Sequence, residues 1–250
     1  MESVGSGQKG RIHAFDVIRG FSVISMVLFH FCYDLKFIAG LRLGFFASPF
    51  IDVWRATISW TFVFIAGCMF SYSRNNFKRS LKYLAVALLI FVVTTLARVD
   101  IPINFGIIFC MGACTLTCFV LDRVGVHVKG NLISIIMAIC FLLCLHVPSG
   151  YFGNFGLALR LPHQLYDCGW LSWAGFPSPT FSSGDYYPLI PFVFLYLSGA
   201  AFSACHHDAG YATWFEKLHC SPLEFVGRHA LAIYVFHQPV LLLLTMLFIQ

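Results

Sequence analysis

The sequence predicts an all-α integral membrane protein, a bundle of about seven transmembrane helices. Of its 250 residues 59% are hydrophobic and 11% are charged, whereas a soluble domain carries about 25% charged residues. The mean hydropathy is +0.80, and several apolar runs approach the roughly 20 residues that a helix needs to cross the hydrocarbon of a bilayer. The alternating pattern of a membrane β-barrel strand is absent from the sequence, which favours the helical bundle.

Seven apolar segments make up most of the chain. They cover residues 16–38, 51–73, 81–97, 104–122, 131–147, 186–204 and 223–249. No internal repeat or low-complexity tract divides them, so we expect a single domain over residues 1–250. The stretch before Asp16 has no apolar run typical of a cleavable signal peptide, and the first segment itself is expected to direct insertion.

The basic residues predict the orientation of the bundle. With a cytoplasmic amino terminus, the inner side receives eleven of them: Lys9, Arg11, Arg19, Arg74, Lys78, Arg79, Lys82, Arg123, Lys129, Lys217 and Arg228. The outer side receives five: Lys36, Arg42, Arg55, Arg98 and Arg160. The positive-inside rule therefore favours a cytoplasmic amino terminus and a carboxyl terminus outside. The net charge of +5 follows from short inner loops and does not indicate nucleic-acid binding.

The longest connection covers residues 148–184 and is rich in glycine, proline and aromatic residues. It lies outside on the predicted topology. Connections of this length are usually functional or disordered, and tryptophan and tyrosine are typical of the membrane surface. We expect it to fold over the bundle as a lid on a site that opens outward.

The ten cysteines do not resemble a disulfide framework, because most of them lie inside predicted spans. Small apolar packing residues are the better interpretation. Cys110, Cys114 and Cys118 share a helix face, but no histidine or carboxylate lies between them, and thiolates that face lipid make a poor metal site. We expect no metal.

The first segment, "DVIRGFSVISMVLFHFCYDLK", carries ionisable residues in an apolar helix. At about 100° per residue, Asp16, Arg19, His30 and Asp34 fall within about 60° on one face. Each ionisable group facing lipid costs on the order of 3 kcal/mol, so this face is expected to look into the bundle and to mark a functional site. The alternative for Asp16 and Arg19 is an ion pair at the helix entry.

His30 and Asp34 are the candidate catalytic residues. His30 lies deep in the segment, and Asp34 follows one turn later on the same face. A carboxylate at this spacing can orient an imidazole and stabilise its charged form, as where histidine acts as a general base. A buried histidine that only packs is the alternative, and the charged stripe favours the functional interpretation.

Five motifs in order carry a resemblance to a known family. They are "FDVIRGFSVISMVLFHF" (15–31), "FVFIAGCMFSYSR" (62–74), "INFGIIFCMG" (103–112), "DYYPLIPFVFLYLSGAAFS" (185–203) and "LEFVGRHALAIYVFHQPVLL" (223–242). With the Arg19 to His30 spacing, the chain resembles transmembrane acyltransferases. More closely, it is similar to the bacterial relatives of the heparan-alpha-glucosaminide N-acetyltransferase catalytic domain.

The resemblance implies transfer of an acetyl group from cytoplasmic acetyl-coenzyme A to an acceptor across a bacterial cytoplasmic membrane, commonly a sugar amine or hydroxyl. Arg19 lies at the inner end of the stripe, and His30 is about 16 Å further out, comparable to an extended pantetheine arm. Arginine suits phosphate recognition. Arg74, Arg228 and His229, near the same surface, are further candidates for coenzyme A binding.

Four residues are expected to bind the acceptor on the outer side, near the histidine of the first segment. Asn104 opens the fourth segment, Asp185 and Tyr186 open the sixth, and His237 lies about 21 Å into the seventh counted from Leu223. Pro239 is expected to loosen that last helix, because proline lacks a backbone donor.

Two mechanisms and two rival functions stay open. His30 either deprotonates the acceptor for direct attack on the thioester or is itself acylated, and the neighbouring carboxylate favours the first. A transporter could use the charged stripe as a substrate or proton path, although no internal repeat supports it. A haem-binding electron carrier could ligate iron through His30 and His237. Each of these functions is compatible with a homodimer.

Overall fold

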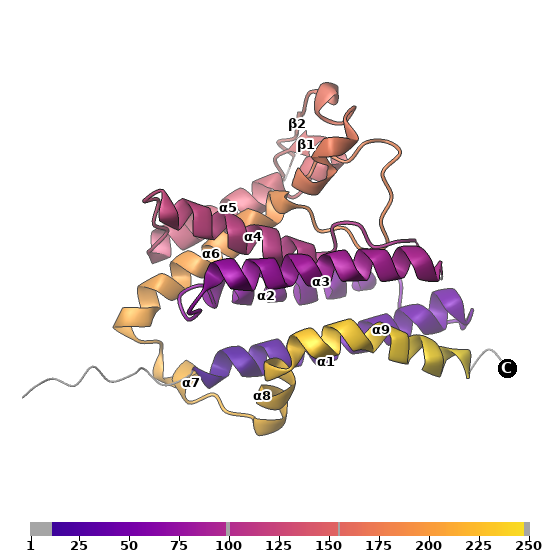
Figure 1. Ribbon diagram of the computed structural model, residues 1–250, viewed down its shortest axis with the longest axis horizontal. Helices are drawn as coiled ribbons and strands as arrows, with labels where there is room; N and C mark the ends of the chain where they lie inside the picture. The colour runs from indigo at the N-terminus through magenta and orange to yellow at the C-terminus, as the bar shows by residue number, and fades with distance from the viewer. Residues whose placement is uncertain (1–11, 99–100, 155, 248–250) are drawn as a thin grey trace, which may run out of the picture. The chain divides into compact units, whose positions relative to one another are not determined.

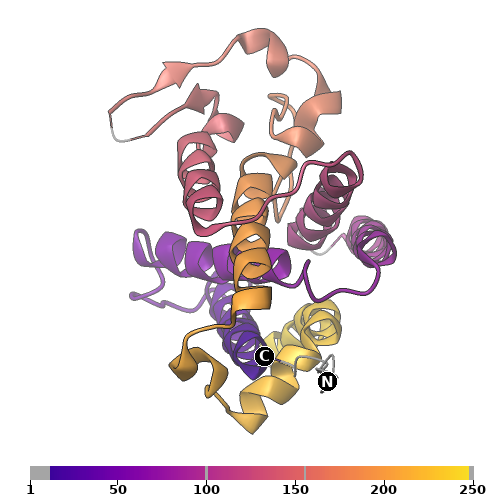
Figure 2. The same cartoon turned by 90° about the vertical axis from the view of Figure 1, so that its left-hand side faces the viewer.

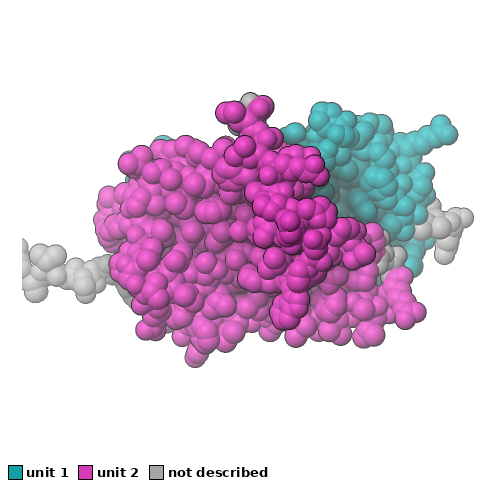
Figure 3. Space-filling model, turned by 90° about the horizontal axis from the view of Figure 1, so that it is seen from above, with its two compact units in different colours: residues 1–58, 211–250 teal, residues 59–210 magenta. Residues whose placement is uncertain are grey.

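The computed structural model describes residues 12–98, 101–154 and 156–247, and these residues are mostly helical (Figure 1). The chain divides into two compact units, coloured separately in Figure 3. Unit 1 combines residues 1–58 with residues 211–250, and unit 2 consists of residues 59–210.

Unit 1 is built on α1, α8 and α9. Its helices are α1 (His13–Tyr33), α7 (Thr213–Glu216), α8 (Ser221–Arg228) and α9 (Ala230–Met246), and a π-helix (Asp34–Ile38) continues α1. The amino-terminal half of α1 packs on α8, and α9 lies beside α1 (Figure 1). An apolar stripe of Phe21, Ile24 and Leu28 remains exposed on α1, as expected of a surface that faces lipid.

Glycines allow α1 and α8 to approach closely. A Cβ atom on Gly20 would overlap the carbonyl oxygen of Leu223, and a Cβ atom on Gly227 would overlap the carbonyl oxygen of Asp16. Small residues at a crossing are a common way for membrane helices to bring their backbones together. The start of α1 is therefore held against the start and the end of α8.

Unit 2 contains α3 (Asn76–Ala97), α4 (Ile107–Arg123), α5 (Asn131–Cys144) and α6 (Leu189–Ala209). The helix α6 lies between α5 and α4, and α3 packs on α4 (Figure 2). The second half of α2 (Phe50–Cys68) also contacts α6, again through glycines. A Cβ atom on Gly67 would overlap the carbonyl oxygen of Tyr196, and one on Gly199 would overlap that of Phe64.

The long connection between α5 and α6 is ordered by short elements. Strands β1 (Tyr151–Phe152) and β2 (Leu159–Arg160) pair antiparallel, and 3-10 turns cover Val147–Ser149, His163–Leu165 and Gly169–Ala174. The Tyr166 hydroxyl donates to the carbonyl of Val147. Burial raises the pKa of this phenol, so it stays a protonated donor. The function of this connection as a lid remains a prediction.

Several helices are long and apolar enough to cross a membrane. Four pass by length and composition, with bounds His13–Ile38, Asn76–Ala97, Asn131–Ser149 and Leu189–Ala209, and α8 with α9 makes a fifth if the bent pair counts as one span. The helix α4 has 17 residues, and α2 begins with the charged residues Asp52 and Arg55. The total of seven transmembrane helices and the orientation of both termini stay predictions.

The last apolar segment differs from the single helix expected over residues 223–249. It bends by 82° between α8 and α9, at His229, whose backbone is non-helical (φ −100°, ψ 13°). Pro239, expected to loosen this helix, lies inside the continuous helix α9. The reason lies in the side chains at the bend, because the exposed Arg228 and His229 are more stable in water than along a straight path through lipid.

Candidate active site

His30 and His237 contact each other in unit 1. His30 comes from α1 and His237 from α9, and their ring centroids lie 4.9 Å apart in an edge-to-face arrangement with an interplanar angle of 61°. The structure therefore brings a predicted catalytic residue and a predicted acceptor-binding residue together. The rings are in direct contact, which leaves no room for an iron porphyrin between them and disfavours the haem alternative.

The hydrogen bond of His237 determines which ring nitrogen carries the proton in the neutral imidazole. Its Nδ1 donates to the carbonyl of Tyr234 at 2.7 Å, because a carbonyl oxygen can only accept. In the neutral ring the lone pair is then on Nε2. This atom is buried and has no hydrogen-bond partner among residues 12–98, 101–154 and 156–247. His237 thus offers a buried acceptor beside His30.

Asp34 is fully buried at the first position of the π-helix. Such widened turns are frequent at functional sites. The Gln238 Nε2 atom donates to both carboxylate oxygens, at 3.0 and 3.1 Å. Gln238 was not among the predicted site residues; the available signal was a second polar side chain directly after His237 in an apolar segment. That Asp34 also orients His30 stays a prediction.

The amino-terminal end of the charged stripe on α1 forms an ion pair. Arg19 Nη2 lies 2.5 Å from Asp16 Oδ1, and Asp16 is buried. The helix-entry pair considered as the alternative is therefore present. Binding of the donor by Arg19 stays a prediction, as it does for Arg228 and His229, which are exposed at the bend before α9.

The three predicted acceptor-binding residues of unit 2 have structural partners. Ser183 Oγ donates to the carbonyl of Asn104 at 2.8 Å and accepts from its backbone N–H at 2.9 Å. Asp185 Oδ2 accepts from the backbone N–H of Ile107 at 3.2 Å and so caps the start of α4. The structure brings Asn104 and Asp185 together through Ser183.

Tyr186 holds part of the long connection. Its hydroxyl donates to the carbonyl of Ser172 at 2.6 Å, within the 3-10 turn Gly169–Ala174. Burial raises the pKa of Tyr186, which keeps the phenol protonated. Its observed contact is thus structural, and binding of the acceptor stays a prediction.

Arg74 lines an open pocket of unit 2. The pocket has a volume of about 540 Å³ and lies between the α2–α3 connection and the end of α4, where Arg123 provides a second guanidinium. Phe77 and Phe119 add aromatic rings to the lining. Guanidinium groups suit phosphates and aromatic rings suit a base, while Asp122 adds a carboxylate to the lining. Binding of coenzyme A by Arg74 stays a prediction.

Arg79 lies in the first turn of α3, close in sequence to Arg74, and has a structural role. Its Nη1 donates to the carbonyl of Met69 at 2.8 Å and its Nη2 to that of Ala66 at 3.2 Å, and Nη2 also contacts the Tyr196 hydroxyl at 2.5 Å. These carbonyls belong to the carboxyl end of α2, where a cation is favourable. Arg79 therefore stabilises the fold of unit 2.

Comparison with known proteins identifies the family of the chain. The searches of curated proteins and of solved structures returned no match. The family model described as heparan-alpha-glucosaminide N-acetyltransferase, catalytic, matches residues 11–239. This range includes His30, Asp34, His237 and Gln238 and nearly the whole chain, so the protein belongs to the heparan-alpha-glucosaminide N-acetyltransferase catalytic family.

Proposed function

We propose that the protein moves an acetyl or other short acyl group from cytoplasmic acyl-coenzyme A to the amine or hydroxyl of a sugar outside the membrane. The family implies a transferase, and the apolar helices fit an integral membrane protein. The observation that carries the proposal is the contact of His30 with His237, next to the buried Asp34. Acyl transfer needs a base of this kind.

In this mechanism His30 takes the proton of the acceptor as the acceptor attacks the thioester carbonyl. The bond between the carbonyl carbon and sulfur breaks, and the coenzyme A thiolate leaves and is protonated. His237 Nε2, whose lone pair is unused among the described residues, accepts a hydrogen bond from the acceptor and positions it. An acyl-histidine intermediate is the second version, in which the imidazole attacks first.

The donor is bound through its phosphates. The pocket lined by Arg74 and Arg123 is the proposed nucleotide site, and Arg19, Arg228 and His229 are further candidates for contact with coenzyme A. Guanidinium groups bind phosphate through paired N–H donors. Binding of the acceptor by Asn104, Asp185, Tyr186 and His237 stays a prediction from the sequence.

The test uses the purified protein in lipid vesicles with acetyl-coenzyme A labelled in its acetyl group. A panel of amino sugars is supplied, and both labelled product and free coenzyme A thiol are measured. We expect label in one class of sugar, with one thiol released for each acetyl transferred. Passage of unmodified sugar or intact donor without product would overturn the proposal and favour the transporter. Label trapped on the protein without acceptor would identify the acyl-histidine route.

A further inference from the structure

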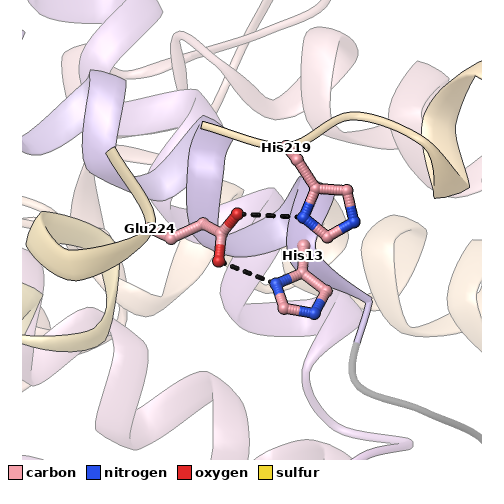
Figure 4. A group of neighbouring side chains, drawn as sticks. All are labelled: His13, His219 and Glu224. Atoms are coloured by element: carbon pink, nitrogen blue, oxygen red, sulfur yellow. Dashed lines mark hydrogen bonds and ion pairs between the residues drawn. The ribbon is translucent and has the colours of Figure 1, made fainter. Parts of the chain in front are cut away.

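Three side chains that acyl transfer does not use meet at one end of unit 1. His13 is the first residue of α1, His219 lies in the turn before α8, and Glu224 lies in the first part of α8. Figure 4 shows both imidazole rings directed toward the same carboxylate. No local pattern in the sequence marks this cluster, because Glu224 is 211 positions from His13.

The distances within the cluster are short. His13 Nδ1 lies 2.7 Å from Glu224 Oε2, and His219 Nδ1 lies 3.2 Å from Oε1. The two ring centroids are 4.2 Å apart. One ligand atom from each residue lies within 4.8 Å of the other two. Around a tetrahedral ion with bonds of about 2.0–2.1 Å, neighbouring ligand atoms stand about 3.3 Å apart, so small side-chain rotations bring the three atoms to ligand spacing.

The backbone around the cluster is fixed. The close approach of Gly20 to Leu223 and of Gly227 to Asp16 holds α1 on α8, and with it the relative position of His13 and Glu224. Glu224 is buried, and the backbone N–H of Cys220 donates to its Oε1 at 3.3 Å. A ligating carboxylate held by a further hydrogen bond is typical of metal sites.

The cluster differs from the other contacts between histidine and carboxylate among the described residues. They are His127 with Asp122, His163 with Asp167 and His207 with Asp208, exposed pairs with one imidazole each. Two imidazoles and one carboxylate are the donor set of an open zinc site, in which water takes the fourth position. Neutral nitrogen donors with a carboxylate also bind other divalent first-row transition-metal ions. The affinity of such a site for these ions follows the Irving–Williams order.

We propose that His13, His219 and Glu224 bind a divalent transition-metal ion, zinc in the first place, that fastens the start of α1 to α8. Each ring binds through the Nδ1 lone pair, so the proton that Nδ1 carries in the hydrogen-bonded form moves to Nε2 through solvent. The ion takes the place of the two hydrogen bonds to Glu224. Because the ion binds the folded protein, it stabilises unit 1.

The test measures zinc binding by the full-length protein in detergent, without a histidine tag and after removal of metal by a chelator. Zinc is titrated against a chromophoric competitor. We expect one equivalent per chain in the wild type. His219→Ala and Glu224→Gln should each weaken binding about tenfold or more. His219 has a side chain 54% exposed, so its replacement is compatible with folding, and Glu224→Gln keeps the shape of the buried side chain.

His163→Ala is the matched control, because its side chain is 69% exposed and also pairs with a carboxylate. It should bind zinc as the wild type does. Zinc should also raise the unfolding temperature of the wild type and of the control, and leave that of His219→Ala unchanged. Equal zinc affinity in the wild type and His219→Ala, or no stoichiometric binding in the wild type, would overturn the proposal. Neither readout depends on acyl transfer.

Discussion

The amide of Gln238 is the clearest single-residue feature of the candidate active site. It donates to both oxygens of Asp34, which is fully buried. A hydrogen bond to a buried charge contributes about 1.5–3 kcal/mol, more than a neutral one. The position of Asp34 in the site thus depends on a residue of another helix.

We expect Gln238→Ala to lower the free energy of unfolding by about 1.5–3 kcal/mol, because a buried carboxylate loses a donor. Thermal unfolding in detergent measures the change. In an Asp34→Asn variant there is no charge to stabilise, so Gln238→Ala should lower the free energy of unfolding clearly less. Equal costs in both backgrounds would show that Gln238 contributes through packing alone.

His30→Ala should reduce acetyl transfer by about a hundredfold to ten-thousandfold, which is the contribution typical of a general base. Binding of acetyl-coenzyme A should be unchanged, since the proposed donor residues remain. The rate of label transfer and an equilibrium binding assay check both parts. His163→Ala, on the exposed connection, is the control and should be fully active; full activity of His30→Ala would leave His30 as a packing residue.

At the scale of elements, paired glycines determine how closely helices pack. The crossing of α1 and α8 uses Gly20 and Gly227, and the crossing of α2 and α6 uses Gly67 and Gly199. At each of these glycines an added methyl group meets a backbone carbonyl rather than a movable side chain. Such contacts cannot relax by a change of rotamer, so the helices themselves must separate.

Gly20→Ala should therefore destabilise the protein by about 1–3 kcal/mol, the usual cost of overpacking. Gly44→Ala is the matched control in unit 1, because a Cβ atom there has nothing within 4 Å. The unfolding midpoint of the two variants should differ clearly. Equal unfolding midpoints would show that the close approach of α1 and α8 does not contribute to stability.

The pocket between the α2–α3 connection and α4 predicts a specific defect in donor binding. Arg74→Ala and Arg123→Ala each remove a lining guanidinium, and we expect the KM for acetyl-coenzyme A to rise about tenfold with a smaller change in kcat. Steady-state kinetics with an excess of acceptor measures this.

Two controls separate phosphate binding from general damage. Arg160→Ala removes an exposed arginine of β2 and should leave the KM for the donor unchanged. With acetyl-pantetheine, which lacks the nucleotide, the pocket variants and the wild type should have the same KM. A defect that persists with acetyl-pantetheine would place the nucleotide elsewhere.

At the scale of the whole molecule, the orientation in the membrane is open to direct measurement. In a variant that retains only Cys168, which is exposed, a membrane-impermeant maleimide should label intact cells. Lys78→Cys in a cysteine-free background should react only after the cells are opened, because the positive-inside rule places α3 with its start in the cytoplasm. The reverse pattern would exchange the donor and acceptor sides.

Sequence reasoning was most successful where all the information lay on one helix. The spacing of His30, on α1, and Asp34, on the π-helix that continues it, follows from helical geometry, and apolar runs are sufficient to predict helices. The sequence did not predict contacts between segments that lie far apart along the chain. Gln238 lies 204 positions from Asp34, so no local pattern connects them. The bend at His229 was missed because hydropathy averages over a window and does not show where the axis turns.

That bend has a consequence for the bilayer around the protein. The helix α9 has 17 residues, about 25 Å at 1.5 Å per residue, whereas the hydrocarbon of a typical bilayer is about 30 Å thick. Since α8 turns away by 82°, it adds almost nothing along the axis of α9. If α9 crosses the bilayer, as the sequence predicts, lipids beside it compress or carry shorter acyl chains, a hydrophobic mismatch that lets membrane thickness act on unit 1.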